Sequence, residues 1–276
     1  MSTLLASANH YTIEQLAGFY NETRVDYMVP MPMNEHRLAE YICDFDVSLE
    51  HSVVAVSDGK VAGLGMLGIR KNSTWVTRLG VVPQNRRHGI GELIMSNMLK
   101  ASQILGMEHV DLEVIKGNER AISLFRKYGF EEKGEYLVLR RAPSLPMVSP
   151  QGKLTSLDRN ETLRIMQSVP RQTWINEFES MANTAEVHGM SLDLEDGSHG
   201  WVIYRKNIST LTHIILHVDS GDPALVGSCL LQHLHLHYPR LDTYAENIKV
   251  TDPHVPAFFA LGYFEAFQRI EMIRPL

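Results

Sequence analysis

The stretch VVPQNRRHGIG, residues 81–91, joins an apolar run to a long amphipathic pattern. Two arginines and a histidine stand directly before two glycines in it. The first N–H groups of a helix have no partners inside the helix, and the helix dipole adds positive potential there. Glycine also lets the backbone come close to a bulky ligand. The stretch therefore predicts a strand-to-helix turn that binds a phosphate or pyrophosphate.

The composition of the chain is that of a globular protein long enough for two domains. It has 276 residues, 44% of them apolar, and a formal net charge of −6. That charge argues against a general nucleic-acid or anionic-membrane binder. Two distant cysteines, Cys43 and Cys229, predict neither a metal site nor a disulfide framework. Without a signal peptide or a run of ~18 apolar residues, we expect a cytoplasmic protein with no membrane partner.

A proline-rich segment without periodicity divides the chain into two halves of similar size. The segment is RRAPSLPMVSPQGK, residues 140–153. We predict a first domain at 1–141, a linker at 142–152 and a second domain at 153–276.

The first half predicts an α/β (α+β) domain. Apolar periodicity predicts helices at 12–20, 34–44, from Leu93 to Gly106, and 118–128. Hairpin turns and alternation predict strands at 52–56, 61–69, 74–82, 109–114 and 135–140, the last one after a turn at 131–134.

The second half repeats this order. The segment FFALGYFEAFQRIEMIRP (258–275) parallels LFRKYGFEEKGEYLVLRR (124–141), and Glu246 aligns with Glu113. We interpret the chain as a diverged internal duplication. Each domain is expected to hold a mixed, mostly antiparallel twisted sheet flanked by helices.

Four motifs of the first half resemble those of the GNAT superfamily of acyl-CoA-dependent N-acyltransferases. RRHGIG (86–91) is similar to its pyrophosphate signature, and Val82-Pro83 stands where the family ends its fourth strand. Leu112-Glu113-Val114 resembles its fifth strand, and NERAISLFRKYGF (118–130) resembles its next motif. The resemblance covers most of residues 10–141, whereas the second half resembles the fold only in layout.

This resemblance implies that acyl-CoA lies between a splayed fourth and fifth strand, with acetyl-CoA as co-substrate. Residues 79–81 would meet the pantetheine chain, and residues 87–92 would cradle the pyrophosphate. The implied cofactor residues are Leu79, Gly80, Val81, Arg86, Arg87, His88, Gly89, Ile90, Gly91, Glu92, Asn118 and Phe125.

The resemblance also implies a general base at Glu113, which alternation places on one strand face with Asp111. A solvated polar face is the alternative interpretation of this pair. The family's thiolate-protonating tyrosine falls at Phe125, which has no proton to donate. Tyr128, one helical turn away, is the candidate general acid, and the alternatives are that it only packs or that water protonates the thiolate.

The second half lacks the basic turn. At the same place it has VDSGDPALVG (218–227), where Asp219 and Asp222 would repel a pyrophosphate and Pro223 removes one N–H group. We expect this half not to bind CoA and to cover the substrate side of the first half. The chain is then expected to be either a monomer that carries its own pseudo-dimer partner or a homodimer. His233 and His237 are four residues apart, but no third ligand supports a metal there.

The predicted function is N-acetyl transfer from acetyl-CoA to a primary amine of a small molecule, amino acid or peptide. A non-catalytic acyl-CoA sensor is the main alternative, since Phe125 replaces the expected acid. A nucleotide-binding module is a further alternative.

Overall fold

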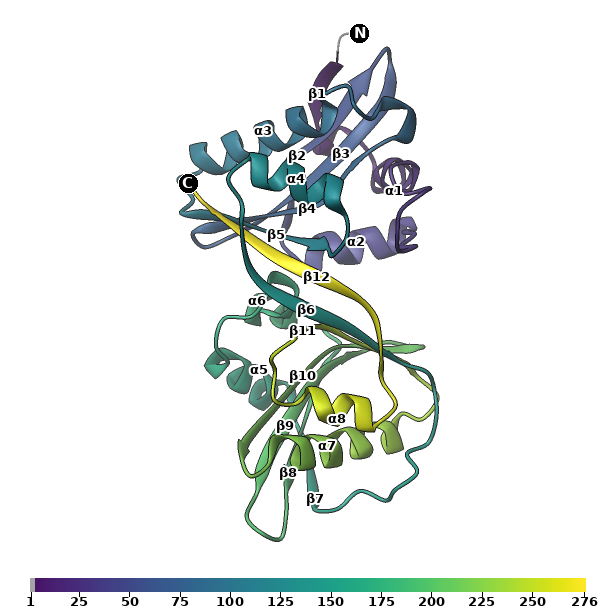
Figure 1. Cartoon of the computed structure of the whole chain (residues 1–276), viewed down its shortest axis with the longest axis vertical. Helices are drawn as coiled ribbons and strands as arrows, with labels where there is room; N and C mark the ends of the chain where they lie inside the picture. Colours follow the sequence, from purple (N-terminus) through teal and green to yellow (C-terminus); the bar gives the residue numbers. More distant parts are fainter. Residues whose placement is uncertain (1–2) are drawn as a thin grey trace. The chain divides into compact units, whose positions relative to one another are not determined.

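The chain divides into two units in the computed structural model, which describes residues 3–276 (Figure 1). The first unit comprises Met1–Lys133 together with the last seven residues, Ile270–Leu276, and the second unit comprises Gly134–Arg269. The predicted division at 141 and 153 does not coincide with these units, because the end of the chain returns to the first one.

The first unit is a sheet covered by helices on both faces. Its strand order is β1-β2-β3-β4-β5-β12, and the last residues of the chain supply the β12 part. In chain order its elements are β1 (Thr3–Ser7), the 3-10 turn η1 (Ala8–His10), α1 (Ile13–Glu22), α2 (Glu35–Asp44), β2 (Val47–Ser57), β3 (Lys60–Arg70), β4 (Ser73–Val81), the 3-10 turn η2 (Pro83–Asn85), α3 (Ile90–Ile104), β5 (His109–Ile115) and α4 (Glu119–Lys127).

The helices α3 and α4 lie on one face of this sheet and α1 and α2 on the other (Figure 1). The α3 face holds a buried core in which Ile94 and Met98 of α3 pack with Val110 and Leu112 of β5. Alternation in β5 turns these apolar side chains toward α3 and leaves Glu113 on the α1–α2 face.

The predicted splay between the fourth and fifth strands is confirmed. The parallel pairing of β4 with β5 runs from Ser73–His109 to Val76–Leu112, although both strands continue beyond it. Arg78 has a φ of +53°, and the register between β3 and β4 shifts at this place. Such a bulge bends its strand and increases the local twist. The bend directs the end of β4 away from β5 and opens the sheet there.

The second unit repeats the order of elements, as the duplication predicts. Its strand order is β6-β11-β10-β9-β8-β7. In chain order its elements are β6 (Glu131–Arg141), β7 (Lys153–Leu157), α5 (Arg159–Ser168), the 3-10 turn η3 (Trp174–Asn176), α6 (Phe178–Ala182), β8 (Val187–Asp193), β9 (His199–Lys206), β10 (Thr210–Ser220), α7 (Pro223–His237), β11 (Asp242–Lys249), α8 (Val255–Ala260) and β12 (Phe264–Pro275).

Two expectations about the middle of the chain are corrected. Residues 131–134 are the first residues of β6 and not a turn. The strand predicted to complete the first half pairs with β11 of the second unit, where Arg140 lies opposite Tyr244. Residues 142–152 hold no helix or strand, and they connect β6 to β7 within the second unit.

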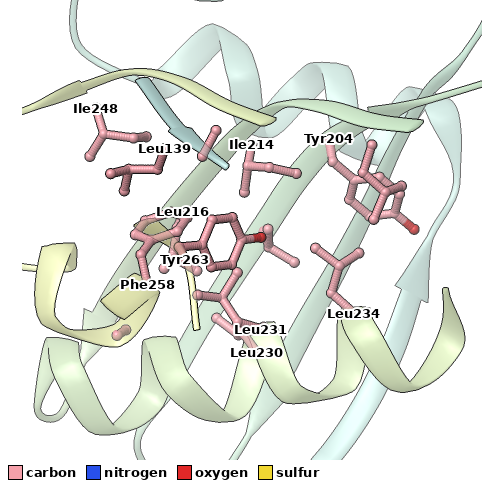
Figure 2. Close-up of a cluster of buried hydrophobic side chains, with 14 of the residues drawn as sticks. Leu139, Tyr204, Ile214, Leu216, Leu230, Leu231, Leu234, Ile248, Phe258 and Tyr263 are labelled. Atoms are coloured by element: carbon pink, nitrogen blue, oxygen red, sulfur yellow. The ribbon is translucent and has the colours of Figure 1, made fainter. Parts of the chain in front are cut away.

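Leucines of α7 form the centre of the core of the second unit. Figure 2 shows Leu230, Leu231 and Leu234 facing Ile214 and Leu216 of the sheet. The helix α7 is apolar along most of its length and not on one face alone, as is typical of a helix that is buried in a core.

Because of His235 on α7, we expect the free energy of unfolding to decrease at acidic pH. His235 is fully buried, and its Nε2 lies 2.9 Å from the hydroxyl of Tyr263. Burial, reinforced by Arg141, lowers the pKa of His235 to about 3. The unfolded chain takes up this proton near pH 6.5 and the folded chain does not, so stability falls as the pH drops below 6.5. At pH 4.5 the loss from this group is about 3 kcal/mol.

The variant His235→Gln removes this titration and keeps a polar partner for Tyr263. Between pH 7 and pH 4.5, its unfolding free energy in urea is expected to fall by about 3 kcal/mol less than that of the parent. His233→Gln, a partly exposed position on the same helix, serves as the control and is expected to follow the parent. Equal declines in parent and His235→Gln would contradict the prediction.

Candidate functional site

The junction between β4 and α3 has an open helix N-terminus. Gly89 is the N-cap of α3, with a φ of +77°, and no side chain caps this end. A Cβ atom built on Gly89 would meet no atom within 4 Å. Glycine is therefore favoured here by its left-handed backbone conformation, because a side chain would have room. The first N–H groups of α3 are therefore available to an anion.

A pocket of about 930 Å³ in the first unit opens at this helix end. It lies between the end of β4, the N-termini of α3 and α4, and the loop that follows α1. Its lining residues are Thr23, Arg24, Asp26, Tyr27, Met28, Leu79, Gly80, Val81, Asn85, Arg86, Arg87, Gly89, Ile90, Gly91, Glu92, Gly117, Asn118, Glu119, Arg120, Ala121, Ser123, Leu124 and Lys127.

The pocket contains all but two of the predicted cofactor residues. His88 is exposed and is not part of the lining. Phe125 is buried in the core, where its ring centroid lies 6.0 Å from that of Phe130. Asn118 is the N-cap of α4, and its side chain accepts a hydrogen bond from the N–H of Ala121. The predicted helix start at residue 118 is thereby confirmed.

Arg86 is engaged by the protein itself. Its two Nη atoms lie 2.6 Å and 2.7 Å from the carboxylate oxygens of Asp26, and its Nε donates to the carbonyl oxygen of Val81. The hydrogen bond between them raises the pKa of Arg86 and lowers the pKa of Asp26. Arg86 therefore fastens the loop after α1 to the basic turn, while Arg87 remains exposed at the mouth of the pocket.

Several pocket residues were not predicted from the sequence. Arg24 donates from Nη2 to the carbonyl oxygen of Leu79 and lies 4.1 Å from the ring centre of Tyr27. Arg120 stands exposed on the first turn of α4, and Lys127 pairs with Glu92 at 2.7 Å. The sequence of the loop at residues 23–28 has no periodicity, so nothing in it predicts that this loop lies beside the turn at 81–91. Arg120 could have been predicted, because it is a basic residue two positions after a helix cap.

Glu113 lies at the place where the sheet opens. It directly follows Leu112, the last residue of β5 that pairs with β4. On this face Tyr41 packs against Trp75, and the guanidinium of Arg78 lies 4.2 Å from the ring centre of Tyr41. Glu113 and Arg78 both act electrostatically on Tyr41, whose pKa is raised chiefly by burial. Glu113 is not part of the pocket lining.

Tyr128 and Asp111, the other two polar candidates, both interact with side-chain or backbone groups of the protein. The hydroxyl of Tyr128 donates to the carbonyl oxygen of Glu92 at 3.0 Å and lies 2.9 Å from the hydroxyl of Ser96. Asp111 is buried, and its carboxylate lies 3.2 Å from Nε2 of His109. The structure therefore does not bring Tyr128 into the pocket, and the polar face of β5 is not uniformly solvated.

The matching helix end in the second unit is closed. Asp222 is the N-cap of α7, and its carboxylate accepts a hydrogen bond from the N–H of Leu225 at 2.8 Å. Pro223 at the first helical position has no N–H group to offer. A carboxylate already occupies the place that a phosphate would take, which agrees with the expectation that this half does not bind CoA.

Residues 16–130 match the model of the Acetyltransferase (GNAT) family. A similar curated protein is N-acetyltransferase family 8 member 3 of Mus musculus, 30% identical over 90 residues, which are 32% of this chain and 40% of that protein. The chain aligns with 28% to 60% of the length of the curated relatives it matches.

Similar solved structures extend over both units. A GCN5-related N-acetyltransferase from Sphaerobacter thermophilus superposes with a TM-score of 0.72 at 15% identity, covering 99% of this chain and 95% of that one. A tandem GNAT protein from the clavulanic acid biosynthesis pathway gives 0.66 at 14% identity, covering 99% and 98%. These likenesses show the fold. Among residues 3–276, no helix has the length and apolar character needed to cross a membrane.

Proposed function

We propose that this chain, whose residues 16–130 match the model of the Acetyltransferase (GNAT) family, transfers an acetyl group from acetyl-CoA to a primary amine. The acceptor class is a small-molecule, amino-acid or peptide amine. The open N-terminus of α3 at the mouth of a large pocket is the observation that carries the proposal, because it suits the pyrophosphate of the cofactor.

In this proposal the two faces of the first sheet have different tasks. The phosphates lie on the α3–α4 side, near Gly89, Gly91 and Arg87. The pantetheine chain runs along β4 and carries the thioester into the gap beyond Val76 and Leu112. The amine approaches from the α1–α2 side, where Glu113 lies.

The reaction is a direct acyl transfer. Glu113 accepts the proton of the ammonium group, and the free amine attacks the carbonyl carbon of the thioester. A C–N bond forms, the C–S bond breaks, the new amide nitrogen gives up its second proton, and the departing CoA thiolate takes up a proton. Holding the two reactants together in the gap supplies much of the acceleration, and proton removal supplies more.

A thermal-shift measurement with acetyl-CoA, followed by a thiol-release assay with a panel of amines, tests the proposal. A ligand that binds only the folded state raises the melting temperature. The shift is expected in the parent and not in Arg87→Glu/Gly91→Glu. The control is Arg87→Gln/Gly91→Ala, since a Cβ at Gly91 would make only ordinary contacts, at 3.6 Å. No shift at millimolar cofactor would contradict the proposal, and a shift without thiol release from any amine would favour the sensor.

Tyr128→Phe tests the predicted general acid. We expect kcat to change by less than about threefold, because the hydroxyl proton is donated to Glu92 and a thiol pKa of about 8.5 lets water protonate the leaving group. The variant should mainly lose stability, by about 1 kcal/mol for the missing hydrogen bond. Thiol-release kinetics and urea unfolding measure the two effects. A loss of kcat of about 100-fold would instead identify Tyr128 as the acid.

A further inference from the structure

Three neighbouring strands of the second unit place two histidines and an aspartate on one face. Strand pairing sets His199 of β9 opposite Asp193 of β8, and His217 of β10 opposite Trp201 of β9. The register between β9 and β10 shifts between Val218 and Ser220, so Asp219 is the extra residue of a bulge. By alternation, Asp219 shares the face of His217 and His199.

The carboxylate of Asp219 lies between the two imidazoles. One oxygen is 3.7 Å from Nε2 of His199, and the other is 3.6 Å from Nε2 of His217. These separations are too long for hydrogen bonds. Ligand atoms about 2.0–2.2 Å from a tetrahedral Zn²⁺ lie roughly 3.4 Å apart. The two separations between Asp219 and the imidazoles are thus within a few tenths of an ångström of the spacing between two ligands of one metal ion.

A carboxylate orients one of these imidazoles. Nδ1 of His199 lies 2.9 Å from a carboxylate oxygen of Asp193. A proton on Nδ1 leaves the lone pair on Nε2, the atom that faces Asp219. Carboxylate, histidine and metal stand in this order in many protein zinc sites, where the outer carboxylate fixes the tautomer and raises the basicity of the ligand.

A buried third histidine repeats the arrangement beside them. His254 lies with its ring centroid 6.1 Å from that of His217, and its Nδ1 is 2.7 Å from the carboxylate of Asp252. Only 7% of its side chain is exposed, and its Nε2 has no hydrogen-bond partner. A buried nitrogen without a partner costs free energy, and a metal ion is one partner that would satisfy it.

From this cluster we propose that the second unit binds a divalent transition-metal ion, preferably Zn²⁺, through His199, Asp219 and His217, with His254 as the neighbouring fourth group. In its present arrangement residues 3–276 contain no group of three His, Cys, Asp or Glu side chains that would hold a metal ion, so binding requires a small closure around the ion. Imidazole and carboxylate ligands at an open surface suit Zn²⁺ or Co²⁺, and Mg²⁺ and Ca²⁺ favour all-oxygen shells.

The test uses the full chain without a histidine tag, freed of metal by a chelator and titrated with Zn²⁺ in a calorimeter. Co²⁺ serves as a spectroscopic probe, since its visible absorption reports the ligand geometry. The site variant is His217→Asn/Asp219→Asn. The matched control is His233→Asn/His237→Asn, which removes the two histidines of α7. In that pair Nδ1 of His237 already bonds the carbonyl oxygen of His233.

We expect one Zn²⁺ per chain, and at least about 30-fold weaker binding in the site variant with unchanged affinity in the control. Asp193→Asn is expected to weaken binding by about tenfold, as loss of an outer carboxylate does in metal sites. An unchanged circular dichroism spectrum of the metal-free site variant shows that it is folded. Absence of Zn²⁺ uptake by the parent, or equal affinities of parent and site variant, would overturn the proposal. Acetyl transfer plays no part in this readout.

Discussion

Replacing Gly89 by aspartate is expected to weaken acetyl-CoA binding by at least about 30-fold. The change gives the open end of α3 a carboxylate cap like the one that Asp222 provides on α7. The new carboxylate would compete for the free N–H groups and repel the pyrophosphate. Two like charges about 5 Å apart repel by roughly 1 kcal/mol in water and more near a protein surface, and the pyrophosphate carries more than one charge. Calorimetric titration with acetyl-CoA measures the loss.

Gly89→Asn is the matched control, because asparagine has the same shape without the charge. Asparagine and aspartate are the residues that best tolerate the left-handed conformation that Gly89 adopts, and open space surrounds the position. Both variants should therefore pay a similar backbone cost. The amide oxygen of asparagine can also accept hydrogen bonds from the helix end, so the difference between the two variants isolates the charge. If Gly89→Asn weakens binding as much as Gly89→Asp, the charge at position 89 has no effect, and the pyrophosphate does not lie at this helix end.

Glu113→Gln is expected to lower kcat by about 100-fold or more while the affinity for acetyl-CoA stays within about threefold. General base catalysis contributes typically 10²–10⁴-fold, and Glu113 lies outside the pocket lining, at the first position beyond the strand pairing. The acid limb of the pH profile of kcat/KM, which reports the ionisation of the base, should also disappear. Steady-state kinetics over a pH series measures both effects.

Asp111→Asn is the control for Glu113→Gln, since it removes a carboxylate from the same face of β5 two residues earlier. Asp111 is paired with His109 and opposite Trp75 inside the paired part of the sheet, so its loss should affect stability more than kcat. Similar kcat losses in the two variants would mean that the charge of the strand face matters and that Glu113 is not the base.

The sequence predicts the features that depend on neighbouring residues. The turn at 81–91, the helix at 118–128 and the opening between β4 and β5 follow from glycine positions, periodicity and the resemblance, and the structure confirms each of them. The missing phosphate turn of the second half was likewise visible in Asp222 and Pro223. What the sequence does not supply there is the hydrogen bond by which Asp222 closes the helix end.

Features that depend on distant partners were missed. An alternating segment predicts a strand but not its neighbour, so residues 135–140 gave no sign that β6 pairs with β11. Arg86 belongs to the signature by pattern, yet its partner Asp26 stands 60 residues earlier in an aperiodic loop. Phe125 departs from the family pattern, and its burial with Ile122 on the inner side of α4 explains why it packs in the core and does not line the pocket.

The last strand has a consequence for the order in which the chain folds during synthesis. The first unit is made first, but its sheet includes Ile270–Leu276, which the ribosome adds only after the whole second unit. At about 5–20 residues per second, the intervening stretch takes roughly 7–30 s to translate. During that time β5 lacks the neighbour that it has in the finished sheet, and Ile270 and Met272 are missing from the core. The first unit is therefore the last to be completed, and until then the nascent chain exposes an open strand edge to which chaperones or other nascent chains can bind.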